Sequence, residues 1–257
     1  MKYAGLTDIG RYRSENQDSF EIIVYNQNTV LAIVCDGMGG AAGGKIASSL
    51  AISSFLSQFE KLLKEKNISF DDKNSCNLDI LEEMMKDSVK EANRIIFEYA
   101  QNDVGLIGMG TTLVACLVIG RDCLVCNVGD SRLYHLTKTS MRQITRDHSY
   151  VQMLIDTGML EKKLAAAHPD RNVIVRAVGT RAGVTAETFR FTLNANETVL
   201  LCSDGLSGYV SNEQIYSLLW GSEDIFKHDE KKKAFSLIQA ANDGGGRDNI
   251  TAVILTY

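Results

Sequence analysis

The stretch IVCDGMGGAAGG, residues 33–44, contains the strand end that is most informative about the fold of this chain. Apolar residues lead into Asp36, and five glycines then fall within the eight positions from 37 to 44. Such apolar runs are typical of a buried strand, whereas aspartate is disfavoured in strands and costly to bury unpaired. A strand that ends in this way fits either a dinucleotide-binding turn or a metal site, and the rest of the sequence has to distinguish them.

Length and composition are those of an ordinary globular protein. The chain has 257 residues and a formal net charge of −5, and its lysines and arginines form no cluster dense enough for nucleic-acid binding. Residues 1–10 lack the hydrophobic region of a signal peptide, and no run approaches the roughly 20 apolar residues of a membrane span. We therefore expect a cytoplasmic protein with no nucleic-acid or membrane partner.

Nothing in the sequence resembles a linker between domains. There is one proline, Pro169, and there is no internal repeat or low-complexity segment. We therefore expect a single domain over residues 1–257, and we expect it to be a monomer.

The cysteines favour a structural role. Five of the six lie inside apolar runs, where a thiol behaves as a small hydrophobic side chain. Cys123 and Cys126 have CxxC spacing, but they belong to a strand-like run, in which residues three apart point to opposite faces. We expect no zinc or redox site at this pair.

Hydrophobic periodicity divides the chain into groups of strands and pairs of helices. Helical periodicity covers residues 44–66, 78–101, 211–220 and 230–242. Strand-like runs cover residues 2–10, 19–26, 29–36, 111–120, 123–130, 132–137, 141–145, 185–193, 198–204 and 249–257, and short helices and loops cover 148–180. The strands in each group are joined by connections too short for parallel crossovers, so we expect antiparallel neighbours. This order predicts an α+β fold in which stacked sheets are flanked by helices.

Aspartates recur at the ends of the apolar runs. The positions are Asp36, Asp130 and Asp204 beside glycines, Asp248 before the last run, and Asp18 before the second. One such aspartate is equally well explained as a turn or helix-cap residue, but several together indicate a bound cation. Oxygen ligands without a histidine–cysteine set indicate magnesium or manganese, and a glycine carbonyl can be a further ligand.

Arg13 lies five residues before Asp18, in a segment between two strand-like runs. A planar guanidinium beside a metal cluster is suited to bind a phosphate, because it offers paired donors. Taken alone, Arg13 would be better explained as half of a surface salt bridge.

Six motifs, spread from residue 8 to residue 251, resemble those of one family. They are DIGRYRSENQD (8–18), VCDGMGG (34–40), GMGTTL (108–113), NVGDSRLY (127–134), LLCSDGL (200–206) and GGRDNIT (245–251). In this order they are similar to the motifs of the metal-dependent type 2C, or PPM, protein serine/threonine phosphatases, and in particular of the compact bacterial members. The resemblance implies a four-layer α-β-β-α sandwich of two antiparallel sheets flanked by helices.

The resemblance also implies a centre of two manganese or magnesium ions, with a possible third. Asp36 would bridge the first two ions, and the Gly37 carbonyl would bind one of them. Asp204 and Asp248 would complete the shell of the first metal. Asp130 matches the position that holds a third, looser metal in bacterial relatives.

Other matching positions would support these ligands. Asp18 would act mainly through a metal-bound water, and Asn249 would support the neighbouring Asp248. Arg13 matches the phosphate-binding arginine of the family.

The segment from about 148 to 172 would be a mobile flap subdomain over the site. Its residues of interest are His148, which could touch substrate or simply start a helix, and Asn172, near a position that can contact the third metal. The sequence departs from relatives at two points. Met38 stands where eukaryotic members have a histidine proposed as general acid, and Gln17 stands where many relatives have glutamate.

The implied reaction is direct hydrolysis of phosphoserine and phosphothreonine by a hydroxide that bridges two metals, with Arg13 stabilising the phosphoryl oxygens. No phosphoenzyme is expected, because no cysteine or aspartate is placed as a covalent nucleophile. The partners would be phosphorylated proteins, namely a bacterial serine/threonine kinase that the protein opposes and the substrates of that kinase.

Three other functions fit parts of the sequence less well. Residues 37–42 satisfy GxGxxA, but no strand ending in an acidic residue follows about 20 residues later, as a dinucleotide-binding fold requires. A serine hydrolase would need a GxSxG motif, which is absent. A phosphatase-like regulatory module that binds phosphoproteins with little or no turnover is the main alternative, although such modules typically lose metal-binding aspartates that are all present here.

Overall fold

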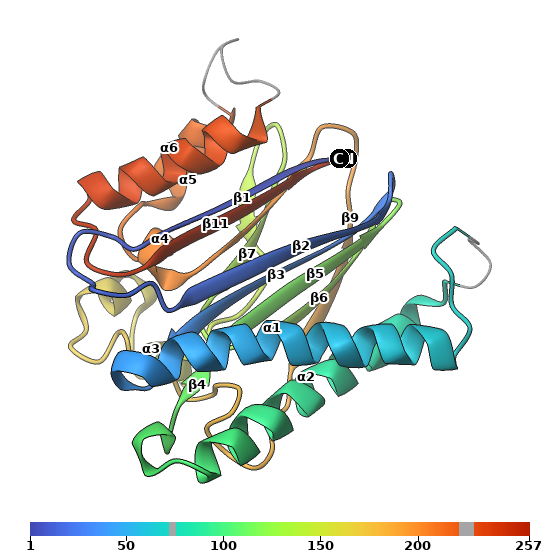
Figure 1. The fold of residues 1–257 in the computed structure, drawn as a ribbon. Helices are drawn as coiled ribbons and strands as arrows, with labels where there is room; N and C mark the ends of the chain where they lie inside the picture. Colours follow the sequence, from blue (N-terminus) through green and yellow to red (C-terminus); the bar gives the residue numbers. More distant parts are fainter. Residues whose placement is uncertain (72–75, 221–228) are drawn as a thin grey trace.

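Two antiparallel sheets lie face to face between layers of helices in the computed structural model, which describes residues 1–71, 76–220 and 229–257 (Figure 1). One sheet, called the β1 sheet, has the order β1 (Lys2–Asp8), β11 (Ile250–Thr256), β10 (Thr198–Cys202), β7 (Arg132–Leu136) and β8 (Met141–Gln143). The other, called the β2 sheet, has the order β2 (Asp18–Asn26), β3 (Thr29–Met38), β5 (Leu113–Ile119), β6 (Asp122–Val128) and β9 (Glu187–Thr192), and β4 (Gly110–Thr111) pairs with the end of β3. The predicted four-layer α-β-β-α sandwich is confirmed.

Helices cover the outer face of each sheet (Figure 1). The β2 sheet is covered by α1 (Gly40–Glu65) and α2 (Leu78–Gln101), and the β1 sheet is covered by α4 (Asp204–Ser207), α5 (Asn212–Trp220) and α6 (Glu230–Asp243). Three apolar clusters fill the spaces between the four layers. In the described parts of the chain, no helix combines the length and the apolar character needed to cross a membrane.

β3 shows why the central strands consist of continuous apolar runs. Ile33 and Cys35 face the α1–α2 layer, while Ala32 and Val34 face the other sheet. A strand that is buried on both faces needs an apolar side chain at every position, and periodicity of two therefore disappears from its sequence.

The same alternation separates the two cysteines of the CxxC spacing. Cys123 lies between the two sheets, whereas Cys126 lies in the cluster under α1 and α2. The prediction that they point to opposite faces is confirmed, and neither of these two cysteines is part of a disulfide.

The turn from β3 into α1 is sharper than the sequence indicates. α1 begins at Gly40, four residues before the predicted start of the helix. Gly39 and Gly40 have φ angles of 127° and 75°, which glycine adopts without the strain that a Cβ would cause. The glycines therefore let the backbone pass from strand to helix within two residues, which brings the start of α1 close to the end of β3.

Residues 148–175 leave the sandwich and return beside the same point. This excursion contains α3 (Tyr150–Asp156) and the short 3-10 helix η3 (Lys162–Ala167), and a bridge between Ser149 and Ile174 joins its two ends. It includes the segment predicted to be a flap, and its mobility stays a prediction.

Candidate active site

The predicted aspartates lie at the ends of strands that meet at one end of the sandwich. In Figure 1 this is the end on the left, where β3 leads into α1. Asp36 near the end of β3 lies opposite Asp18 at the start of β2. Asp204 begins α4 directly after β10, and Asp248 precedes β11, the neighbour of β10. Because antiparallel neighbours begin and end at a shared edge, apolar runs far apart in the sequence bring these carboxylates together.

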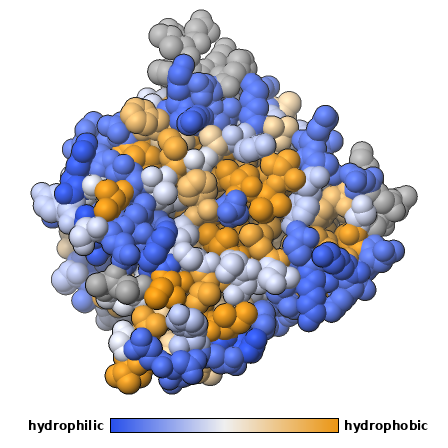
Figure 2. All heavy atoms as spheres, viewed as in Figure 1, coloured by the Kyte–Doolittle hydropathy of each residue, from blue (hydrophilic) through white to orange (hydrophobic). Residues whose placement is uncertain are grey.

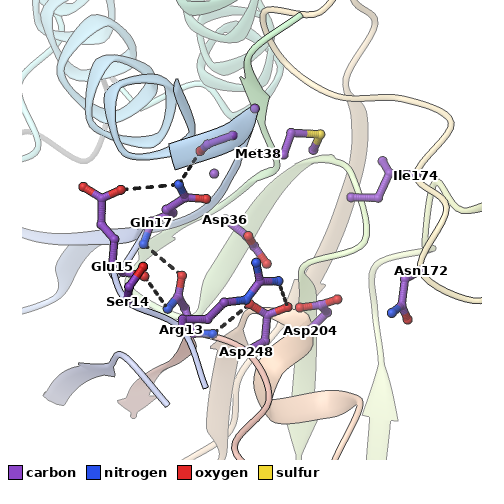
Figure 3. Close-up of a pocket in the computed structure, with 14 residues that line it drawn as sticks. Arg13, Ser14, Glu15, Gln17, Asp36, Met38, Asn172, Ile174, Asp204 and Asp248 are labelled. Carbon is purple, nitrogen blue, oxygen red and sulfur yellow. Dashed lines mark hydrogen bonds and ion pairs between the residues drawn. The ribbon is translucent and has the colours of Figure 1, made fainter. Parts of the chain in front are cut away.

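Three of these aspartates line a cleft of about 430 Å³ (Figure 3). They are Asp36, Asp204 and Asp248. Other predicted site residues and neighbours that line the cleft are Arg13, Gln17, Gly37, Met38, Asn172 and Asn249. In Figure 3, Arg13 and Asn172 come from opposite sides of the cleft, from the loop before β2 and from the excursion at 148–175.

Asp18 lies behind the wall of the cleft and is 1% exposed. The hydroxyl groups of Ser203 and Thr251 donate to its Oδ2 at 2.7 and 2.6 Å, while its Oδ1 has no hydrogen-bond partner among the described residues. Burial raises the pKa of Asp18 to about 7, although the two hydroxyl groups act in the opposite direction. The carboxylate is therefore held in one orientation, with one oxygen that still lacks a partner.

Asn249 ties the segment that carries Arg13 to the start of β11. Its side-chain nitrogen donates to the carbonyl oxygens of Ile9 and Glu15 at 3.0 and 2.9 Å, and its Oδ1 accepts from the Gln17 N–H at 2.9 Å. The side chain is 5% exposed, so all three bonds are shielded from water. This explains how an amide beside Asp248 can position a loop more than 200 residues away in the sequence.

Arg13 projects from that loop into the cleft. Its guanidinium donates to Asp248 Oδ2 at 2.8 Å, and this hydrogen bond raises the pKa of Arg13 above its usual value. The side chain is 52% exposed and makes no other hydrogen bond with the described residues. Asp248 therefore orients the guanidinium, while its remaining donors stay available to an anion in the cleft.

Electrostatic repulsion at the cleft is strong. Burial raises the pKa of Asp36, and the charges of Asp18 and Asp204 raise it further. The pKa of Asp204 is raised by burial and by the charge of Asp248. Carboxylates gathered in this way favour a bound cation, which removes the repulsion and replaces lost hydration.

Asp130 and His148 lie deeper than the cleft and do not line it. Asp130 is 7% exposed, its Oδ1 has no partner among the described residues, and burial raises its pKa. His148 is also 7% exposed and makes two hydrogen bonds with Gly129, the residue before Asp130. The backbone N–H of His148 donates to the Gly129 carbonyl at 2.9 Å, and its ring Nδ1 accepts from the Gly129 N–H at 3.0 Å. His148 thus faces the turn before Asp130, whereas Asn172 faces the cleft.

Thr112 is a site residue that the sequence did not single out. Its Oγ1 accepts from the Asp36 N–H at 2.9 Å and lies 2.7 Å from Ser131 Oγ, while its own N–H donates to the Asp36 carbonyl at 2.8 Å. It therefore joins the strand of Asp36 to the turn of Asp130. GMGTTL contains this threonine, but nothing local in the sequence shows that its hydroxyl points to another motif.

The residues fit a hard divalent cation in their chemistry. The donors are carboxylates and a carbonyl, and the buried Oδ1 atoms of Asp18 and Asp130 have no hydrogen-bond partner among the described residues. As the side chains stand, no three acidic, histidine or cysteine side chains in residues 1–71, 76–220 and 229–257 form a group that could hold a metal.

Comparison with known proteins identifies the family. Residues 11–239 match the family model of protein phosphatase 2C. The chain belongs to the protein phosphatase 2C family. The serine/threonine phosphatase stp of Listeria welshimeri is 36% identical to this family member over 252 residues, which are 97% of this chain and 93% of that protein.

Solved structures of phosphatases have the same fold. Serine/threonine phosphatase Stp1 from Staphylococcus aureus superposes with a TM-score of 0.86 at 33% identity, covering 100% of this chain and 94% of that one. The catalytic domain of serine threonine protein phosphatase PstP, in complex with two manganese ions, has a TM-score of 0.78 at 32% identity and covers 98% of this chain and 96% of that one. The membership predicted from the six motifs is confirmed.

Proposed function

We propose that this member of the phosphatase 2C family hydrolyses phosphoserine and phosphothreonine in proteins, with bound manganese or magnesium. The observation that carries the proposal is the meeting of Asp36, Asp204, Asp248 and Arg13 in one cleft. Carboxylates suited to a hard cation and a guanidinium suited to a phosphate are the two parts that phosphoryl transfer to water requires. The names of the bacterial relatives, which are serine/threonine phosphatases, support the same activity.

The proposed metal ligands are Asp36, the Gly37 carbonyl, Asp204 and Asp248, with Asp130 as a ligand of a third ion. Bound there, divalent ions would supply positive charge to the phosphoryl oxygens and lower the pKa of a water molecule. The manganese ions of the PstP structure support this assignment by analogy. The rise in the pKa of Asp36 and Asp204 supports it from this chain's own residues.

Arg13 would bind the phosphoryl group of the substrate. Its free donors face the cleft, and a guanidinium can donate two parallel hydrogen bonds to phosphate oxygens. Gly39 and Gly40 at the start of α1 also line the cleft, so the positive end of this 26-residue helix favours the same anion.

Ser203, Thr251 and Asn249 would act as positioning residues. The two hydroxyl groups hold Asp18 so that its unpartnered oxygen stays in one place. Asn249 holds the loop of Arg13. Such buried hydrogen bonds set the geometry of the site before substrate binds, which lowers the cost of reaching the transition state.

No histidine or cysteine is found among the described residues that line the cleft, and Met38 occupies the wall next to Gly37. The proposed mechanism therefore has no histidine as general acid at this position and no covalent phosphocysteine. We also propose that the substrates are phosphoproteins made by a serine/threonine kinase, whose action this protein would oppose.

The test is hydrolysis of a phosphothreonine peptide with manganese, after removal of metal with EDTA, and with manganese restored. We expect activity with manganese and none in EDTA, and we expect Asp36→Ala and Asp204→Ala to abolish it while circular dichroism shows a folded protein. The matched control is Asp243→Ala, because Asp243 is an exposed carboxylate at the end of α6, outside the cleft.

Full activity in EDTA would refute the metal mechanism. Tight binding of the phosphopeptide without turnover, in the presence of manganese or magnesium, would instead favour the phosphoprotein-binding module.

A further inference from the structure

Two arginines beside the cleft lie on loops that hold each other. The Arg11 N–H donates to the Gly246 carbonyl at 2.6 Å, and Arg11 Cγ lies 2.6 Å from the place where a Cβ on Gly246 would be. Arg247 is the next residue in that second loop. Both arginines are exposed, so two loops that touch each other each carry an exposed positive charge near a residue that lines the cleft.

The same two loops carry groups of the proposed phosphoryl site. Arg11 precedes Arg13 by two residues, and Arg247 directly precedes Asp248. Successive Cα atoms are about 3.8 Å apart, so each of these arginines begins within roughly 4–7 Å of a residue that lines the cleft. The Arg13–Asp248 ion pair joins the two loops a second time.

Neither arginine is paired with an acid in the part of the chain that the structure describes. Within the described residues, Arg11 and Arg247 have no ion pair and no side-chain hydrogen bond, whereas Arg94, Arg132 and Arg190 are each paired with carboxylates. A guanidinium that has no ion pair within the protein can bind an anion on another molecule. Its paired donors match a carboxylate or a phosphate on another molecule.

Tyr209 and Arg247 both lie beside Gly245. The Arg247 Cγ and a ring carbon of Tyr209 lie 3.8 and 3.9 Å from the position that a Cβ on Gly245 would take. Burial raises the pKa of the Tyr209 hydroxyl, the charges of Asp204 and Asp248 raise it as well, and the charge of Arg247 lowers it. The charge of Arg171 lowers the pKa of Tyr209 as well, so this tyrosine lies in the field of both arginines and of the site aspartates.

We propose that Arg11 and Arg247 form a subsite for an anionic residue that neighbours the target phosphoserine or phosphothreonine in the substrate. The subsite rests on the proposed function, and it selects phosphoproteins with an aspartate, a glutamate or a second phosphorylated residue beside the target. An exposed guanidinium–carboxylate pair contributes modestly, so each arginine is expected to favour such substrates about 2- to 5-fold.

The test compares three phosphothreonine peptides on the manganese-loaded enzyme, with alanine, aspartate or a non-hydrolysable phosphonate residue on both sides of the target. We expect the wild type to have a higher kcat/KM for both anionic peptides, mainly through a lower KM. Arg11→Gln and Arg247→Gln should each reduce this preference, and the double variant should remove it. Turnover of the alanine peptide and of p-nitrophenyl phosphate should stay unchanged.

Arg142→Gln is the matched control, because Arg142 is an exposed arginine on β8, outside the two loops that carry Arg13 and Asp248. A wild-type enzyme without preference for either anionic peptide would overturn the subsite, and so would a double variant that keeps the preference. A loss on all three peptides and on p-nitrophenyl phosphate alike would also overturn it, since the arginines would then act on the shared phosphoryl site. Absence of turnover of the alanine peptide by the wild type would instead contradict the proposed function.

Discussion

Replacing Asp18 with asparagine should make the metal-free protein more stable. The carboxylate of Asp18 is 1% exposed and its Oδ1 has no partner among the described residues, so its charge is buried without full compensation. A rise of its pKa from 3.8 to about 7 corresponds to about 4 kcal/mol of destabilisation at pH 8. The asparagine oxygen can still accept from Ser203 and Thr251, but its amide nitrogen takes the place of Oδ1, which has no partner among the described residues, and this costs about 1–3 kcal/mol.

The net expectation for Asp18→Asn is therefore a gain of about 2 kcal/mol at pH 8, or about 4–8 °C in Tm. The sign of its pH dependence follows from the raised pKa. The folded protein holds a proton on Asp18 up to about pH 7, whereas the unfolded chain releases it near pH 4. The penalty of the charge is thus fully present above pH 7 and disappears as the pH falls below 7 toward 4, so the advantage of the variant should shrink over that range.

The assay is urea unfolding in EDTA at pH 8 and at pH 5, followed by circular dichroism. Asp243→Asn serves as the control, because this exposed residue should change the free energy of unfolding by no more than about 0.5 kcal/mol. The reasoning is refuted if Asp18→Asn is less stable than the wild type at pH 8, or if its advantage is equally large at pH 5.

Two further predictions concern the backbone around the site. Thr112→Val should lower the free energy of unfolding in urea by about 1–3 kcal/mol, because the buried Asp36 N–H and the Ser131 hydroxyl both lose a partner. Thr112→Ser should keep most of the stability. Equal stability of the two variants would contradict this role of the Thr112 hydroxyl. Gly37→Ala should prevent folding or remove manganese-dependent activity, because the new Cβ would lie 2.0 Å from a backbone carbonyl oxygen of α1. Gly183→Ala is the control, since nothing lies within 4 Å there, and wild-type activity in Gly37→Ala would show that the turn can relax.

The layers of the fold were predictable because most of their signals are local. Continuous apolar runs such as that of β3 and the helical periodicity of α2 depend on residues close in sequence, and α2 occupies its predicted range. The division between β4 and β5 was not predictable. Residues 111–120 form one apolar run, and β4 and β5 pair with β3 in one register. The break falls at Thr112, where the Asp36 N–H donates to the side-chain Oγ1 of Thr112.

The candidate site was likewise predictable from the sequence only in part. Aspartate beside glycine after an apolar run is a local signal, and it found Asp36 and Asp204. The hydroxyl groups that orient Asp18 belong to Ser203 and Thr251, 185 and 233 residues away, and no spacing in the sequence indicates such a bond. Likewise, the hydrogen bonds between His148 and Gly129 form only when the end of β6 and the excursion at 148–175 have folded against each other.

The position of β11 has a consequence for how the protein is made. β1 is the first strand in the sequence and pairs only with β11 among the described strands, so it has no neighbour in its sheet until residue 256 has been synthesised. Asp248 lies directly before β11 and is synthesised at about the same time, so Arg13 also lacks its ion-pair partner until then. A nascent chain still attached to the ribosome before this point can have folded helices, yet it lacks a complete cleft. Translation that stops short of β11 therefore yields an inactive product with an unpaired strand edge, which chaperones and proteases can distinguish from the finished enzyme.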